Sequence, residues 1–226
     1  MTNDQLPTEK QLLPLPEPHF SNRIELMKEA RTLAQRAWLE SGQVSDLCLN
    51  PAGLAEFYGY TLYEDEFNPA DLPPDSPLYA NSSLVKAADS GLIEITLEKR
   101  DPIPRQRFSM AHEIGHLMWF REHMSKDEFR ATPIRVWRHA ANRPLDDEEY
   151  FRTNPHDYFA DMFAHMFLIP NSTAARLADP ELTIDFKLEA QRLKVSEETL
   201  RNRLYYYYLE LANSSIATPP KDFASV

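Results

Sequence analysis

Two histidines four residues apart, with a glutamate beside the first, are the strongest chemical signal in the chain. They belong to the run Ala111-His112-Glu113-Ile114-Gly115-His116, an H-E-x-x-H pattern within a helical pattern. In an α-helix, positions four apart differ by about 40° around the axis, so both imidazoles project from one face and can share one metal ion. Glu113 lies about 100° away, where its carboxylate can accept a proton from a metal-bound water. The pattern predicts a catalytic metal site.

A third protein ligand is expected, because a catalytic zinc site usually has three protein ligands and a fourth position for water. Asp157, Asp161 and His165 follow at four-residue spacing and form one polar stripe on an otherwise apolar helix. We predict that Asp157 is the third ligand and that Asp161 orients one of the imidazoles. His156 is the alternative ligand, and salt bridges with nearby arginines are the alternative role of the stripe.

Hydrolysis of a peptide bond is the chemistry that this site suits. A bound metal lowers the pKa of its water toward 7 and polarises a carbonyl, while Glu113 takes the proton and returns it to the leaving amine. A donor to the oxyanion is also expected, and Tyr158, His165 and His123 are candidates that the sequence does not rank. Imidazole and carboxylate ligands favour Zn²⁺, and Mn²⁺ or Fe²⁺ could replace it.

The elements that must position these residues are two apolar helices, predicted over residues 108–120 and 158–169. Gly115 suits a helix position that another backbone or a substrate approaches closely. An amphipathic helix, capped by Ser21 and ended by Gly42, and a shorter one over residues 47–58 precede them. Residues 60–63 are prone to form a strand, and residues 83–88 and 92–96 flank a turn with Gly91 and predict a hairpin. The fold class is therefore α+β, mainly helical with a small antiparallel sheet.

The domain organisation follows from the polar and proline-rich segments. Residues 1–20 and 213–226 are predicted to be disordered tails, and residues 21–170 to be the catalytic domain. Residues 171–212 carry three short helical signals, near Ser172, Thr183 and Ser196, and form a C-terminal helical module. The long polar segment 121–155 joins the two ligand helices and is predicted to be a flap over the metal, with disorder as the alternative.

Composition excludes several classes of function. The formal net charge of −11 disfavours binding to nucleic acids and to anionic membranes. The single cysteine, Cys48, cannot form an intramolecular disulfide and is predicted to be a buried packing residue. Without a signal peptide or a membrane span in the sequence, a cytoplasmic location is expected.

A local basic cluster is interpreted as a solvated loop. It comprises Arg130, Arg135, Arg138, His139 and Arg143.

Residues 105–117 (RQRFSMAHEIGHL) and 160–170 (ADMFAHMFLIP) resemble the ImmA/IrrE metallopeptidases. The resemblance extends to the helix near Arg23 and to residues 91–96 and 193–204, so it covers residues 21–212. It implies a gluzincin-like zinc endopeptidase with a zincin-like core. It also implies a protein substrate, a transcriptional repressor usually of the helix-turn-helix type, whose cleavage derepresses genes in response to DNA damage or phage infection.

The chain departs from this family at two positions. Members usually have a glutamate in place of Asp157 and an asparagine in place of Asp161. Because aspartate is one methylene shorter, either the helix lies closer to the metal or another residue completes the site.

Residues 193–204 (LKVSEETLRNRL) also resemble a helix-turn-helix. Glu197 and Glu198 would bring acidic side chains to the DNA, so we interpret this module as part of the groove for the protein substrate. The alternative function is a non-catalytic regulator with a structural metal that binds a partner or DNA. The presence of Glu113 argues against it, because a structural metal needs no carboxylate beside it.

Overall fold

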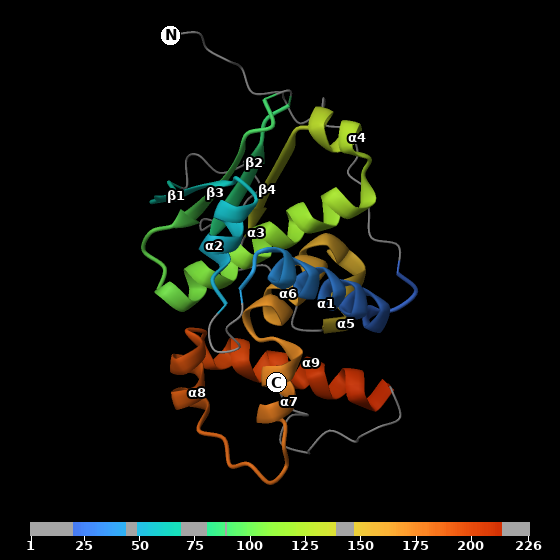
Figure 1. The fold of residues 1–226 in the computed structure, drawn as a ribbon, viewed down its shortest axis with the longest axis vertical. Helices are drawn as coiled ribbons and strands as arrows, with labels where there is room; N and C mark the ends of the chain where they lie inside the picture. The colour runs from blue at the N-terminus through green and yellow to red at the C-terminus, as the bar shows by residue number, and fades with distance from the viewer. Residues whose placement is uncertain (1–19, 44–48, 69–80, 89, 139–146, 214–226) are drawn as a thin grey trace.

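The computed structural model describes residues 20–43, 49–68, 81–88, 90–138 and 147–213. The predictions for Cys48, for His139 and Arg143, and for nearly all of the two tails lie outside these residues. The described chain forms α1 (Arg23–Glu40), α2 (Pro51–Phe57), β1 (Thr61–Asp65), β2 (Ser82–Lys86), β3 (Ile93–Glu98), α3 (Ile103–His123), α4 (Lys126–Ala131), β4 (Ile134–Arg138), α5 (Asp147–Thr153), α6 (Pro155–Leu168), α7 (Asn171–Leu177), α8 (Phe186–Leu193) and α9 (Glu197–Asn213) (Figure 1).

The α+β fold class is confirmed, but the sheet is mixed. Its strand order is β1-β3-β2-β4. The predicted hairpin is present, since β2 and β3 are antiparallel with Lys86 opposite Ile93. β1 runs parallel to β3, contrary to the expected antiparallel sheet. β1 and β3 are neighbours in the sheet but are separated along the chain by β2, so no tight turn joins them and they can pair in parallel.

Two helices form the centre of the molecule. α3 lies across the sheet, and α6 packs against α3 and is covered by α1 (Figure 1). Every residue of α3 from Phe108 to Phe120 is buried, and so is every residue of α6 from Tyr158 to Leu168. Helices that are apolar on most sides are stable only when neighbours surround them. The polar residues of these two helices are therefore buried with them and need polar partners or a metal.

The segment 121–155, predicted to be a flap over the metal, contains helices and a strand. α3 continues to His123, and α4 begins with a capping box formed by Ser125 and Glu128. β4 then pairs with β2 in antiparallel register and forms an edge of the sheet, with Ile134 buried. The role of this segment as a flap stays a prediction; β4 has regular structure because it gains its hydrogen bonds from β2, a strand far away in the sequence.

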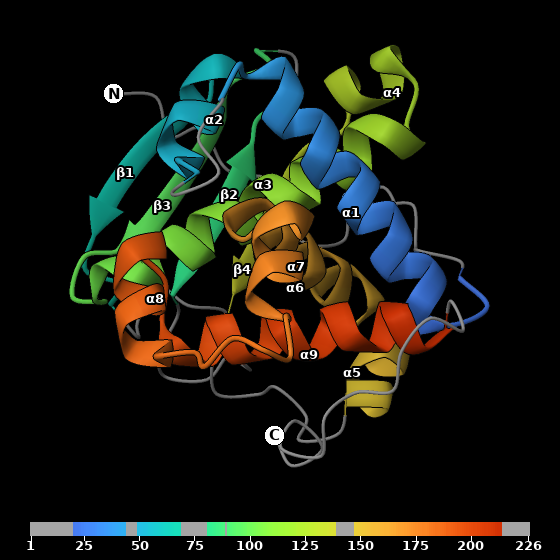
Figure 2. The ribbon, with the colours of Figure 1, turned by 60° about the horizontal axis from the view of Figure 1, so that its bottom comes forward.

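The C-terminal module consists of α7, α8 and α9. Lys194, with φ 54°, ends α8 in the left-handed conformation, and Ser196 accepts a hydrogen bond from the Thr199 backbone N–H at 3.0 Å, as a helix N-cap does. α9 is longer than predicted, because residues such as Leu200 and Leu204 form a continuous buried face. It packs on α6, α7 and α8 and runs along one side of the molecule (Figure 2). Among the described residues, no helix combines the length and apolarity that a membrane span requires.

Candidate metal centre

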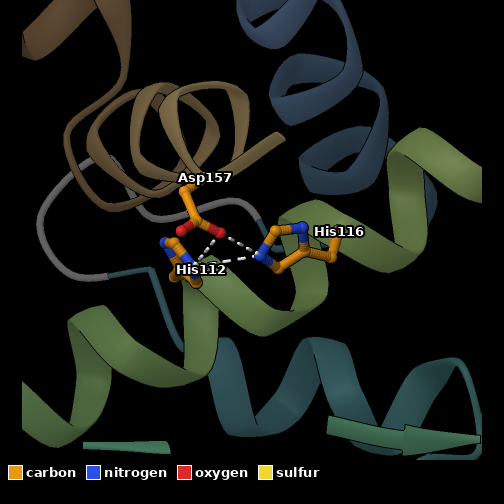
Figure 3. Close-up of side chains that lie close together, drawn as sticks. All are labelled: His112, His116 and Asp157. Atoms are coloured by element: carbon orange, nitrogen blue, oxygen red, sulfur yellow. Dashed lines mark hydrogen bonds and ion pairs between the residues drawn. The ribbon is translucent and has the colours of Figure 1, made fainter. Parts of the chain in front are cut away.

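His112, His116 and Asp157 converge between α3 and α6 (Figure 3). The two Nε2 atoms of the histidines lie 3.1 Å apart. Asp157 Oδ1 lies 3.3 Å from His116 Nε2 and 4.0 Å from His112 Nε2. Both histidines are buried, whereas the Asp157 side chain is 39% exposed and forms the open side of the group. His112 and His116 lie on the first predicted helix, and Asp157 lies in α6, which begins three residues before the predicted start at residue 158.

These distances suit a tetrahedral cation. Donors bound at about 2.0–2.1 Å in a tetrahedral arrangement lie roughly 3.3 Å from one another. The three observed separations, 3.1, 3.3 and 4.0 Å, lie close to that value. The shorter aspartate reaches the two histidines because α6 lies very close to α3. The residues present therefore fit a metal ion with two nitrogen ligands and one oxygen ligand.

The close contact between the two helices depends on Gly115. A Cβ atom at this position would lie 3.0 Å from Ala160 Cα and 3.1 Å from Phe163 Cβ. Such distances are shorter than real Cβ atoms normally tolerate, and the neighbours are backbone and a buried aromatic residue. Gly115 thus permits the approach that was expected of it, and the approaching backbone is that of α6.

Asp161 binds the outer nitrogen of His112. The His112 Nδ1 to Asp161 Oδ1 distance is 2.8 Å, and both side chains are buried. The Tyr150 hydroxyl donates to Asp161 Oδ2 at 3.4 Å, and an Arg138 nitrogen lies 3.6 Å from Asp161 Oδ1. A carboxylate that accepts the Nδ1 proton leaves the Nε2 lone pair directed at the metal position. The guanidinium of Arg138 compensates in part for the charge of this buried carboxylate.

Glu113 is fully buried, and one of its oxygens is occupied. The Ser82 hydroxyl, at the start of β2, donates to Glu113 Oε1 at 2.6 Å. Ser82 is fully buried too, and β2 is hydrogen-bonded on both sides by β3 and β4. Within the described chain, Glu113 Oε2 has no hydrogen-bond partner. One oxygen is thus fixed by the sheet and the other is available to accept a proton.

The contact between His116 and Asp157 shifts the pKa values of both side chains. Burial acts to lower the pKa of His116, but the hydrogen-bonded Asp157 carboxylate outweighs burial, and the net pKa is raised. Burial acts to raise the pKa of Asp157, but the hydrogen bond to His116 lowers it overall. The alternative ligand His156 is not in the group that converges. Its ring centroid lies 5.6 Å from that of Phe120, and burial lowers its pKa to about 4.

The three candidates for the oxyanion donor lie in different places. His165 is buried against Phe108 and Tyr206 and lines a pocket next to the metal-binding group. The Tyr158 hydroxyl donates to Asp147 Oδ2 at 3.1 Å, so Tyr158 links α6 to α5. His123 forms an ion pair with Glu29 at 3.2 Å near the end of α3. Of the three, only His165 lines the pocket.

Three residues near the site were not identified as functional from the sequence. Nothing in the sequence distinguishes Ser82 from any other serine. Tyr150 was placed in the predicted flap, and Arg138 was assigned to a solvated loop. The alternation of Ile134, Val136 and Arg138 is a strand signal that would have placed Arg138 on the inner face of β4.

Known proteins similar to this chain include one family and one solved structure. A comparison with curated proteins gives no match. Among solved structures, a Mycobacterium tuberculosis transcriptional regulator is similar, with a TM-score of 0.47 and 18% identity. The match covers 80% of this chain and 47% of that one, so this chain spans about half of that protein's length. Residues 90–205, just over half of the chain, match the peptidase M78 family, described as the IrrE N-terminal-like domain. The chain therefore belongs to this family, as its resemblance to the ImmA/IrrE metallopeptidases indicates.

Proposed function

We propose that the protein is a zinc-dependent endopeptidase that cleaves a protein substrate. The observation that carries this proposal is Glu113. A buried carboxylate with one oxygen held by Ser82 and the other without a partner lies on the same helix as two convergent histidines. A structural metal site has no use for such a group, whereas hydrolysis needs it as a proton acceptor. This favours catalysis over the alternative of a metal-stabilised regulator.

Each residue has a role in the proposed mechanism. His112, His116 and Asp157 would hold the metal, and Asp161 keeps His112 in the tautomer whose Nε2 faces it. Zinc, when bound, would activate water and polarise the peptide carbonyl. Glu113 accepts the proton at Oε2 and delivers it to the leaving amine. His165 and Arg138 line the pocket and are the proposed donors to the carbonyl oxygen.

The substrate that we propose is a helix-turn-helix transcriptional repressor, whose cleavage derepresses stress-response or phage-response genes in the cytoplasm. Membership of the family supports this choice. The site itself supports an extended peptide as substrate. β4 is an edge strand, and its last residue, Arg138, lines the pocket, so the backbone of a peptide could pair with this edge.

The test is Glu113→Gln, assayed on the repressor encoded by a neighbouring gene. We expect the variant to bind one zinc per chain with unchanged melting temperature and to lose cleavage, because only the proton acceptor is removed. Cleavage within about tenfold of wild type would contradict the proposed role of Glu113. Binding of the repressor without cleavage by the wild type would favour the regulator instead.

A further inference from the structure

A pocket of about 350 Å³ extends from the metal-binding group toward the start of α9. It is lined by His112 of α3 and Asp157 of α6, and also by Ser196, Glu198 and Asn202 at the start of α9. The predicted catalytic module and the C-terminal module thus share one cavity. A substrate side chain adjacent to the bond held at the metal would extend into this cavity and meet the first turns of α9.

Near the metal-binding group the pocket is lined by aromatic rings and by the charged side chains of Asp161 and Arg138, and on α9 it is lined by polar side chains. Phe108 is mostly buried and has the His165 ring against it at 4.9 Å. Thr199, also mostly buried, continues the wall on α9. Glu198 is exposed and Asn202 is half-buried at the outer end. Such a pocket suits a long side chain with an apolar stem and a polar end.

Around the pocket, each charged side chain but one lies near a group of opposite charge or would bind the metal. Asp157 would be neutralised by the metal, and Asp161 contacts both His112 and Arg138. Arg105 lies 4.0 Å from the buried carboxylate of Asp101. Among the described residues, Glu198 forms no ion pair. The unmatched charge of the pocket is therefore negative and lies in the first turn of α9.

We propose that this pocket is a specificity subsite that receives a lysine or arginine side chain of the protein substrate, next to the scissile bond, and that Glu198 and Asn202 recognise its charged end. The inference rests on the proposed peptidase function. The aliphatic stem of the substrate residue would lie along Phe108 and Thr199, with its cation at Glu198. The net charge of −11 also favours association with a basic protein.

The experiment uses the full-length zinc-loaded protein and a library of internally quenched decapeptides. A cleaved peptide is resynthesised with lysine, norleucine or glutamate at each position flanking the scissile bond. At one position, we expect wild type to prefer lysine over norleucine in kcat/KM by about two- to fivefold, the range for one exposed ion pair. Glu198→Gln should remove this preference, and Glu198→Lys should shift it toward glutamate.

Glu197→Gln is the matched control. It makes the same change in net charge on the same helical turn, but Glu197 does not line the pocket. Its lysine preference should equal that of wild type. An unchanged preference in both Glu198 variants, or equal losses in Glu197→Gln and Glu198→Gln, would overturn the subsite. Melting temperature and zinc content, measured in parallel, should be unchanged because Glu198 is exposed.

The two proposals fail in different ways. If wild type and Glu113→Gln hydrolyse the library equally, the peptidase function is wrong and the subsite with it. If only wild type hydrolyses the library but its side-chain preference does not depend on Glu198, the peptidase function holds and the subsite alone is wrong. Asn202→Ala provides a second variant, for which a weaker lysine preference is expected and a loss of zinc is not.

Discussion

Replacement of Gly115 by alanine tests whether the distance between α3 and α6 controls the metal centre. The new Cβ atom would lie 3.0–3.2 Å from three atoms of Ala160 and Phe163, so the helices must separate by a few tenths of an ångström. Overpacking of this kind costs about 1–3 kcal/mol. Replacing a glycine by alanine in a helix interior stabilises the helix by about 1 kcal/mol. We therefore expect the free energy of unfolding of the metal-free protein to fall by about 0–2 kcal/mol.

The effect on metal binding should be larger than the effect on stability. α3 carries both histidines and α6 carries Asp157, so any separation lengthens the distances of 3.3 and 4.0 Å between carboxylate and imidazoles. Metal sites tolerate displacements of only about 0.5 Å. We expect zinc affinity to fall by about tenfold or more, which is in the range for changes that misorient ligands.

Urea denaturation of the metal-free protein and competition with a chromophoric zinc chelator measure these two quantities. Gly53→Ala in α2 is the control, because its nearest neighbour is the Asn50 side-chain amide at 3.3 Å, which can move. That variant should be neutral or more stable and should bind zinc normally. If Gly115→Ala is stabilised as much as Gly53→Ala and keeps wild-type zinc affinity, the reasoning about helix separation is refuted.

Three further predictions concern single residues. Asp157→Ala should lose zinc, whereas His156→Ala should retain it. If the measured zinc content shows that Asp157→Ala keeps the metal and His156→Ala loses it, the ligand assignment is wrong. Ser82→Ala should lower kcat by about 10- to 100-fold, because one hydrogen bond to a charged group contributes about 1.5–3 kcal/mol, with KM and zinc content unchanged. Ser83→Ala, which alters the opposite face of β2, should leave kcat unchanged. The guanidinium that binds Glu98 lowers the pKa of this carboxyl to about 2. The ionised carboxylate of Glu98 therefore stabilises the fold fully above the ordinary carboxyl pKa, and this stabilisation is lost as the pH falls toward 2. In urea denaturation, the free energy of unfolding of Glu98→Gln should fall less between these pH values than that of wild type.

The helices and the residues that converge in the candidate metal centre could be predicted because their signals are local. The spacing of His112, Glu113 and His116 fixes their directions on α3 whatever surrounds the helix, and an apolar helix with one polar stripe must turn that stripe toward a polar partner. Asp157 and Asp161 followed from this argument, and the structure distinguishes them by which imidazole nitrogen each one contacts.

The sheet was less predictable because strand pairing is not local. The direction of β1 and the inclusion of β4 depend on partners far away in the sequence, and the charged residues Arg135 and Arg138 made β4 resemble a loop. The support that the sheet provides to the site was missed for the same reason. Ser82 and Arg138 matter because they are paired across β2 and β4, and no spacing in the sequence reports that pairing.

The edge position of β4 links the candidate metal centre to local opening. Ser82 and Arg138 lie opposite each other in the β2–β4 register; Ser82 contacts Glu113, and Arg138 contacts Asp161. Among the described strands, β4 is held by β2 alone, and edge strands open with less free energy than buried helices. Each opening would withdraw Arg138 from Asp161 while α3 and α6 stay folded. Hydrogen exchange of the β4 amides, followed by mass spectrometry, should therefore slow when zinc is bound, since a ligand that requires the closed state also holds the strand in place.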